Sequence, residues 1–318
     1  MPYRFGSHVS CQGGLLAALN RAVETGCDVM QIFVSSPQKW ATEATLIPVR
    51  PEPKAPRKPD SVLSKQNDAL NCKPISEADT GLFEASWKES GIGATIAHTS
   101  YLINVASPDD ALWQKSLDAL VIEWQRAEQL KIEGLVMHPG AHVKSTVEEG
   151  LERVATAIDS AIGSVRPKYC RLLLENTAGQ GSCLGHQIEQ LGWLLEAVKK
   201  PQHVGVCWDT CHALAAGYDF RTAAGMKAMV AELEKHVGLE NLRAVHINDS
   251  KKDCGSRVDR HEHIGLGFVG DAGFKRFLAS SAFKNLPMYL ETAKEKDEAS
   301  GEDWDVINLR KLRELCKK

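Results

Sequence analysis

The chain has 318 residues, of which 43% are hydrophobic and 25% are charged. This composition is typical of a globular protein, and it excludes a mainly disordered chain, a collagen and a small disulfide-stabilised domain. The 38 basic and 41 acidic residues give a formal net charge of −3. That balance, taken alone, argues against a nucleic-acid-binding protein, because such proteins usually carry a basic excess.

The cysteines and the amino-terminal segment bear on the compartment of the protein. No apolar run approaches the ~18 residues that span a membrane, and no signal peptide is visible at the start. The 9 cysteines are odd in number and widely spread, which favours free thiols in a reducing cytoplasm. Nothing in the sequence requires an oligomer, so we expect a cytoplasmic monomer without membrane contacts.

Short runs rich in Val, Ile, Leu and Met alternate with longer segments of helical character. The predicted strands are Tyr3–Val9, Val29–Val34, Ala94–His98, Gly134–His138, Arg171–Asn176, Val204–Asp209, Arg243–Asn248 and Pro287–Glu291. The predicted helices include Gly14–Thr25, Asp109–Leu130, Val147–Val165, Gln187–Lys199, Thr222–His236 and Ala272–Ser281. Eight such units predict a single (β/α)₈ TIM barrel over residues 1–318. The alternative, a doubly wound open sheet, needs a glycine-rich phosphate loop whose spacing residues 10–14 lack.

The proline-rich stretch 46–74 interrupts this alternation after the second predicted strand. Its prolines are interleaved with the basic residues Arg50, Lys54, Arg57 and Lys58. Proline at this density favours extended chain, so we predict a mobile loop inserted within the barrel domain. Two roles stay open: added contacts to DNA phosphates through the basic side chains, or an exposed loop without a role.

Six of the eight predicted strands carry a metal-capable side chain at or near the carboxyl end. These residues are His98, His138, Glu175, Asp209, His246 and Glu291. Three more candidates, His212, Asp259 and His261, lie just beyond strand ends. Barrel active sites are built on this face, and imidazole and carboxylate ligands suit Zn²⁺ first, with Mn²⁺ or Fe²⁺ as alternatives. The set suffices for two or three ions if a carboxylate bridges them.

These residues also allow interpretations other than a metal cluster. A single histidine at a strand end is more often a hydrogen-bonded polar residue than a ligand, but so many at equivalent positions are improbable by chance. Cys207 and Cys211 form a possible thiolate pair, although buried free cysteine often acts as a small hydrophobic residue. His8 is expected to line the pocket and orient a ligand or a bound oxygen. For His263, a phosphate contact and an exposed loop position stay equally open.

The candidate residues lie in phrases that together resemble the endonuclease IV family of apurinic/apyrimidinic (AP) endonucleases. The phrases are Gly6–Ser10, His98–Asn104, His138–His142, Glu175–Gly181, Asp209–Asp219, His246–Asp249, Arg257–His261 and Leu290–Thr292. They cover nearly the whole chain outside the proline-rich stretch and occur in the family's order. The resemblance implies a (β/α)₈ barrel with three zinc ions, which incises DNA on the 5′ side of abasic sites.

The resemblance also implies a role for each ligand position. His98, His138 and Glu175 match the first zinc site; Glu175 bridges to a second site completed by Asp209, His246 and Glu291; and His212, Asp259 and His261 match the third. Two bridged ions would activate a hydroxide for in-line attack on phosphorus. Glu175 is then the catalytic bridge and orienter, and the products are a 3′-hydroxyl and a 5′-deoxyribose phosphate.

DNA contacts are implied at two loops. Tyr101 and Leu102 match the pair that enters the duplex at an abasic site, with core packing of Leu102 as the alternative. Gln38 stands where the family usually has an arginine that also enters the duplex, and Lys39 follows it. This difference puts the insertion of a side-chain wedge into the duplex in doubt, but it does not affect the residues implied in hydrolysis. Two rival functions stay open. One is a metal-dependent sugar isomerase or epimerase, and the other is a non-catalytic binder of damaged DNA.

Overall fold

The computed structural model describes residues 3–42, 46–49 and 75–317, which form one closed barrel of parallel strands. The barrel strands are β1 (Arg4–His8), β2 (Val29–Phe33), β3 (Thr95–His98), β4 (Gly134–Met137), β5 (Arg171–Glu175), β6 (Val204–Asp209), β7 (Leu242–His246) and β10 (Pro287–Leu290). Their order is β1-β10-β7-β6-β5-β4-β3-β2, so each strand pairs with its sequence neighbours and β1 closes on β10. The predicted TIM barrel is confirmed.

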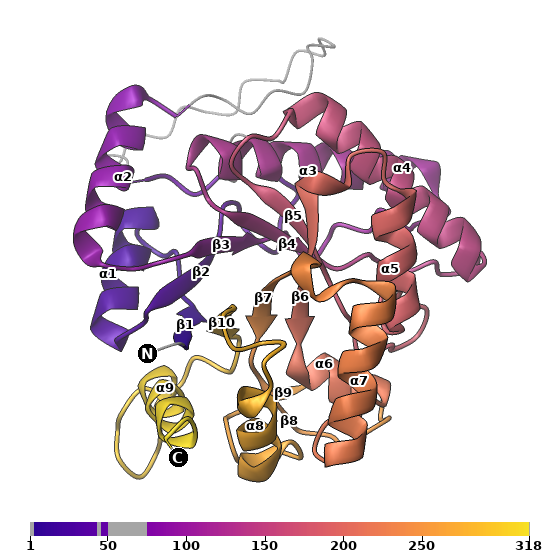
Figure 1. The fold of residues 1–318 in the computed structure, drawn as a ribbon. Helices are drawn as coiled ribbons and strands as arrows, with labels where there is room; N and C mark the ends of the chain where they lie inside the picture. The colour runs from indigo at the N-terminus through magenta and orange to yellow at the C-terminus, as the bar shows by residue number, and fades with distance from the viewer. Residues whose placement is uncertain (1–2, 43–45, 50–74, 318) are drawn as a thin grey trace.

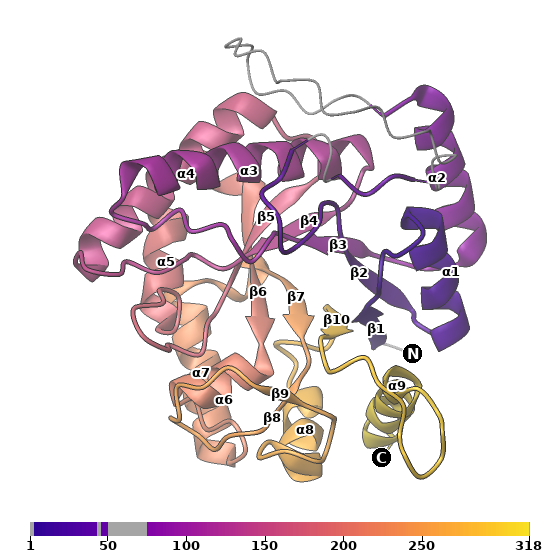
Figure 2. The ribbon, with the colours of Figure 1, turned by 180° about the vertical axis from the view of Figure 1, so that it is seen from behind.

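The helices surround the strands, as Figures 1 and 2 show from opposite sides. They are α1 (Leu15–Thr25), α2 (Glu77–Ser90), α3 (Asp110–Gln129), α4 (Val147–Val165), α5 (Ile188–Ala197), α6 (Thr210–Ala216), α7 (Ala223–His236), α8 (Gly270–Ala279) and α9 (Trp304–Leu315). Side-chain hydrogen bonds fix the residue at which several of these helices begin. At α4, the Thr146 hydroxyl accepts from the Glu149 N–H at 3.1 Å and the Glu149 carboxylate accepts from the Thr146 N–H at 3.0 Å. This reciprocal cap satisfies two N–H groups that the helix leaves free.

Alternate strand residues fill the barrel interior and the layer beneath the helices. The interior cluster is Val29, Ala94, Ile96, Val136, Leu173, Cys207, Ala244 and Tyr289. Residues next to these in sequence, such as Met30 and Leu172, belong instead to the larger core outside the strands. The strands are therefore apolar on both faces, as a parallel sheet covered by helices requires. The interior cluster closes the barrel below the polar residues at the carboxyl ends.

The helices and strands differ from the predicted ones mainly at their ends. All eight strands and the six predicted helices are present, and each bound either matches the prediction or differs from it by at most two residues. The short helix α6, the carboxyl-terminal helix α9 and the hairpin of β8 (Asp249–Ser250) and β9 (His261–Glu262) were not predicted. Within the predicted mobile loop, residues 46–49 are instead packed on the barrel: Pro48 and Val49 carbonyls accept from the first N–H groups of α1 at 2.9 and 3.0 Å. Residues 50–74, with their basic side chains, lie outside the described residues.

The close approach of β1 and β2 at Gly6 yields a stability prediction. A Cβ atom at Gly6 would lie 1.6 Å from the Val29 carbonyl oxygen, whereas at Gly163 in α4 it would meet nothing within 4 Å. We expect Gly6→Ala to lower the free energy of unfolding by about 3 kcal/mol or more, because backbone must move. Gly163→Ala should raise it by up to about 1 kcal/mol, since alanine is the better helix former. Urea unfolding measures both, and equal midpoints for the two variants would contradict the expectation.

Candidate active site

A cavity of about 850 Å³ opens at the carboxyl ends of the strands. Its lining includes His8, Phe33, His98, Tyr101, His138, His212, Asp259, Arg260, His261, Glu291 and Lys294. These residues come from β1, β2, β3, α6 and β9 and from the loops that follow the strands, so segments far apart in sequence meet here. The polar side chains lie directly above the apolar interior cluster.

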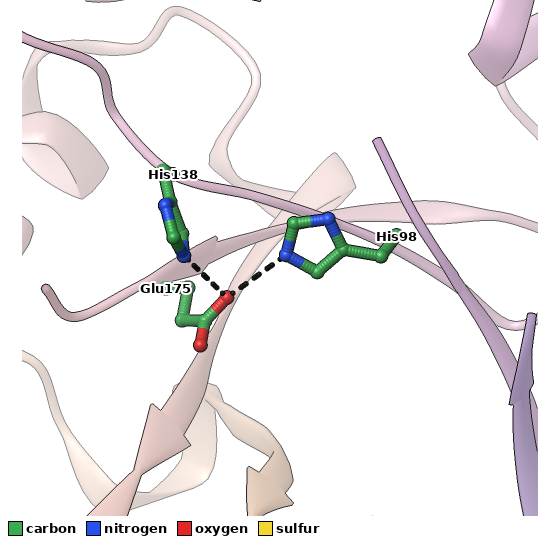
Figure 3. Close-up of side chains that lie close together, drawn as sticks. All are labelled: His98, His138 and Glu175. Atoms are coloured by element: carbon green, nitrogen blue, oxygen red, sulfur yellow. Dashed lines mark hydrogen bonds and ion pairs between the residues drawn. The ribbon is translucent and has the colours of Figure 1, made fainter. Parts of the chain in front are cut away.

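The first possible metal-binding group joins three neighbouring strands. Glu175 at the end of β5 directs Oε2 toward the Nε2 atoms of His98 and His138, at 3.2 and 3.1 Å (Figure 3). His98 ends β3, and His138 follows β4 directly. All three ligand atoms lie within 4.8 Å of one another, which lets one cation bind them together.

The second group shares Glu175 and completes the floor of the site. Its members are Glu175, Asp209, His246 and Glu291. The Nδ1 atom of His246 lies 2.8 Å from Oε1 of Glu175 and 3.1 Å from Oε2 of Glu291. Because the two oxygens of Glu175 face different groups, this carboxylate is placed to bridge two cations.

The third group lies toward the hairpin and consists of His212, Asp259 and His261. Oδ1 of Asp259 lies 3.2 Å from Nε2 of His212 and 3.5 Å from Nε2 of His261. Both Nε2 atoms are buried, yet neither makes a hydrogen bond with the described residues. Buried polar atoms are nearly always paired, so this convergence without hydrogen bonds fits a site that binds a cation.

Oxygen acceptors hold the outer nitrogen of four of these imidazoles. The pairs are His98 with the Thr99 carbonyl at 2.8 Å, His212 with the Asn176 carbonyl at 2.9 Å, His246 with Oε1 of Gln31 at 2.7 Å and His261 with the Glu291 carbonyl at 3.2 Å. A carbonyl oxygen can only accept, so the proton of each neutral ring sits on that nitrogen. The inward nitrogen then presents its lone pair, the form that binds a metal.

Electrostatics favour positive charge at the centre of these groups. Burial raises the pKa of Glu175, but the surrounding imidazoles, His246 foremost, hold it well below its ordinary value. Imidazoles likewise outweigh burial at Asp259 and lower its pKa to about 2. Asp209 and Asp259 outweigh burial at His212 and raise its pKa well above the ordinary value. The carboxylates are therefore ionised near neutral pH, which is the state that coordinates cations.

The expected DNA-contacting side chains lie on two loops beside the cavity. Tyr101 is 66% exposed and Leu102 is 36% exposed, so core packing of Leu102 is wrong. The Tyr101 ring meets the rings of Phe33 and His98 at 5.6 and 5.9 Å, which places it next to the first metal-binding group. Gln38 and Lys39, on the loop after β2, are exposed.

Glu123 of α3, which the sequence analysis missed, joins these two loops. Its buried carboxylate accepts from the Ser35 hydroxyl at 2.6 Å and from the Ser100 N–H at 3.0 Å. The Ser100 hydroxyl donates to the Pro37 carbonyl at 2.9 Å. The sequence does contain an indication of this role. Glu123 falls at helical spacing from the apolar residue Leu120, which places a charged side chain on the buried face of the predicted helix.

Two minor expectations are corrected. His263 is 5% exposed, its ring stacks on Trp304 at 4.0 Å, and its Nε2 lies 3.3 Å from Glu295, so it is neither an exposed loop residue nor free for phosphate. Cys207 belongs to the barrel interior cluster, and no metal-binding group among the described residues includes both Cys207 and Cys211. Burial raises the pKa of both thiols to about 12, which disfavours the thiolate.

The barrel and its site define a class, the xylose isomerase-like TIM barrels, whose family model matches residues 59–315. A probable endonuclease 4 of Chloroflexus aggregans is 40% identical over 99% of this chain and 98% of its own length. A probable endonuclease 4 of Methanoculleus marisnigri is 38% identical over 98% of each chain. The crystal structure of endonuclease IV from Thermus thermophilus has a TM-score of 0.76 at 32% identity over 98% of both chains. The chain belongs to the endonuclease IV family of DNA-repair nucleases.

The fold alone is shared more widely. A D-tagatose 3-epimerase-like protein has a TM-score of 0.64 at 17% identity over 98% of each chain. In the part of the chain that the structure describes, no helix is long and apolar enough to span a membrane.

Glu123 gives a pH prediction. Burial raises its pKa from 4.5 to about 7 in the folded protein. The protonated acid is thus favoured by folding, and its contribution to stability is lost as pH rises from about 4.5 to about 7. Glu123→Gln mimics the protonated acid and cannot ionise. As pH rises through this window, the free energy of unfolding of the wild type should therefore fall relative to that of Glu123→Gln by roughly 3 kcal/mol, at about 1.4 kcal/mol per pKa unit.

Urea unfolding at matched Zn²⁺ concentration measures this difference, and Glu152→Gln on the exposed face of α4 is the control. Parallel pH curves for the wild type and Glu123→Gln would contradict the shift.

Proposed function

We propose that this protein hydrolyses the phosphodiester on the 5′ side of abasic sites in duplex DNA, leaving a 3′-hydroxyl and a 5′-deoxyribose phosphate. One observation carries the proposal: three adjoining candidate metal-binding groups, two of which share Glu175, lie beside the exposed Tyr101 and Leu102. The 40% identity to a probable endonuclease 4 over nearly the whole chain supports it.

We propose that the groups hold three divalent cations, with Zn²⁺ preferred over Mn²⁺ or Fe²⁺ on ligand type. The convergent, unpaired nitrogens of His212 and His261 and the two-sided position of Glu175 fit such a cluster. Bound cations would supply Lewis-acid stabilisation of a phosphate undergoing hydrolysis and would activate water.

The side chains of the protein have separate tasks in this proposal. Glu175 bridges and orients two of the groups through its two oxygens. Asp209 accepts from the His212 N–H at 2.7 Å and from the Asn248 amide at 2.6 Å, so its carboxylate is fixed before substrate arrives. Such preorganised charge costs no rearrangement during the reaction.

DNA recognition is assigned to the two loops joined by Glu123. The exposed aromatic ring of Tyr101 and the apolar side chain of Leu102 would fill the space of the missing base. Gln38 and Lys39 would contact the DNA backbone, with Lys39 supplying the positive charge that Gln38 lacks.

We further propose that the protein acts as a cytoplasmic monomer. All nine candidate ligands come from one chain, so no partner subunit is needed to complete the site. The free cysteines among the described residues suit a reducing compartment.

The metal prediction is tested with a duplex that carries one abasic analogue. We expect a single incision on the 5′ side of the lesion, lost with chelator and restored by Zn²⁺. Glu175→Gln removes the shared carboxylate and should lower incision by more than about 100-fold, because even outer partners of metal ligands cost 10- to 100-fold. Glu152→Gln is the control. Metal analysis showing fewer than two ions per chain would contradict the cluster, and polyol isomerisation without incision would favour the epimerase alternative.

A second prediction concerns the contribution of Tyr101 to the affinity for abasic duplex DNA. Tyr101→Ala should weaken binding to a non-cleavable abasic duplex by about 10-fold or more, the scale of one lost aromatic contact to nucleic acid. Tyr169→Ala removes another solvent-exposed ring, 57% exposed against 66% for Tyr101, before β5 at the opposite end of the barrel, and should leave binding unchanged. Equal losses for the two variants would show that Tyr101 has no special role.

A further inference from the structure

The buried amide of Gln31 in β2 joins three polar side chains at the floor of the cavity. Its Oε1 lies 2.7 Å from Nε2 of His246. Its Nε2 lies 2.5 Å from Oε1 of Glu291 and 2.8 Å from Nδ1 of His8. The side chain is fully buried, so these three contacts account for its hydrogen bonding.

Only one orientation of this amide is physically acceptable. The Glu291 carboxylate can only accept, so the NH₂ group and not the oxygen must face it. Gln31 then uses its second N–H toward His8, and its oxygen accepts from His246. This arrangement fixes the protons of two imidazoles at once: Nε2–H on His246, and a bare Nδ1 on His8.

A neutral His8 with a bare Nδ1 must carry its proton on Nε2. That atom is buried, has no hydrogen-bond partner among the described residues, and belongs to a side chain that lines the cavity. The other tautomer would aim Nδ1–H at Glu291 over 3.5 Å while opposing the Gln31 amide hydrogens at 2.8 Å. Because the contact with Gln31 is the shorter of the two, we assign the tautomer of His8 that carries its proton on Nε2.

We propose that His8 is a further catalytic residue, whose Nε2–H donates a hydrogen bond to a non-bridging oxygen of the scissile phosphate, and that Gln31 is the positioning residue that sets this tautomer. The inference rests on the proposed function, since it needs a phosphodiester in the cavity. A donor held in a fixed position at the cavity wall can stabilise negative charge that develops in the transition state more than it stabilises the bound substrate. Phe33, whose ring lies 4.3 Å from that of His8, restricts the imidazole.

Two measurements on the Zn²⁺-loaded protein test the proposal. The first is the ¹⁵N spectrum of histidine-labelled protein, with His8 assigned by its loss in His8→Phe. We expect the Nε2–H tautomer for His8 in the wild type and its loss in Gln31→Leu. An Nδ1–H tautomer in the wild type would overturn the proposal without any activity assay.

The second measurement is incision of an abasic duplex. His8→Phe keeps a ring but removes the donor, and should lower kcat by about 100-fold with unchanged zinc content and duplex affinity. His8→Gln restores an N–H donor and should recover at least a tenth of the rate. His203→Phe, before β6 at the opposite end of the barrel, is the matched control.

The outcomes separate the two proposals. Wild-type incision with an unchanged kcat in His8→Phe would overturn the role of His8 alone. Loss of zinc or of duplex affinity in both His8 variants would assign His8 to structure and overturn it as well. Absence of incision by the wild type would reject the proposed function, while the tautomer measurement would still judge the Gln31 arrangement.

Discussion

The carboxylate of Glu175 is the group on which the rest of the site depends. It is fully buried, and a buried charge is costly unless partners surround it. Imidazoles from β3, from the residue after β4 and from β7 meet its two oxygens within 3.2 Å. Those strands reach the same level only because the barrel is closed and its register is parallel throughout. The fold thus sets the geometry of the candidate ligands, and the apolar interior cluster lies beneath them.

The same cluster explains how a mildly acidic chain can act on DNA. Four acids, Glu175, Asp209, Asp259 and Glu291, are drawn into the metal-binding groups. Three divalent ions would add six charges and take the formal sum from −3 to +3. This charge would be concentrated at the face where a phosphate must bind. With such ions bound, the net charge of the chain would be a poor guide to its partner, because the formal sum leaves the ions out.

The meeting of the candidate ligands could be predicted from sequence because a repeating unit places equivalent residues at one face. Six of the nine lie at or just after the end of an apolar barrel strand, and the repeat brings those ends together. The roles of Gln31 and Glu123 could not be predicted from sequence, for the opposite reason. Each is a single polar residue within an apolar pattern, and its partners are set by contacts between different units. His263 was misjudged for the same reason, because its stacking on Trp304 depends on how the loop before α8 packs against α9.

The structure also keeps the candidate metal-binding groups apart from the loop that carries Gln38. The three metal-binding groups draw on β3 to β10 and the hairpin, and none of their members lies on the loop that carries Gln38. That loop is held instead through Ser35 and Glu123, which also position the loop of Tyr101. An exchange of arginine for glutamine at position 38 therefore leaves every ligand contact in place. It would change the charge that the proposed DNA-contacting loop presents, so we expect its effect on affinity and not on the chemical step.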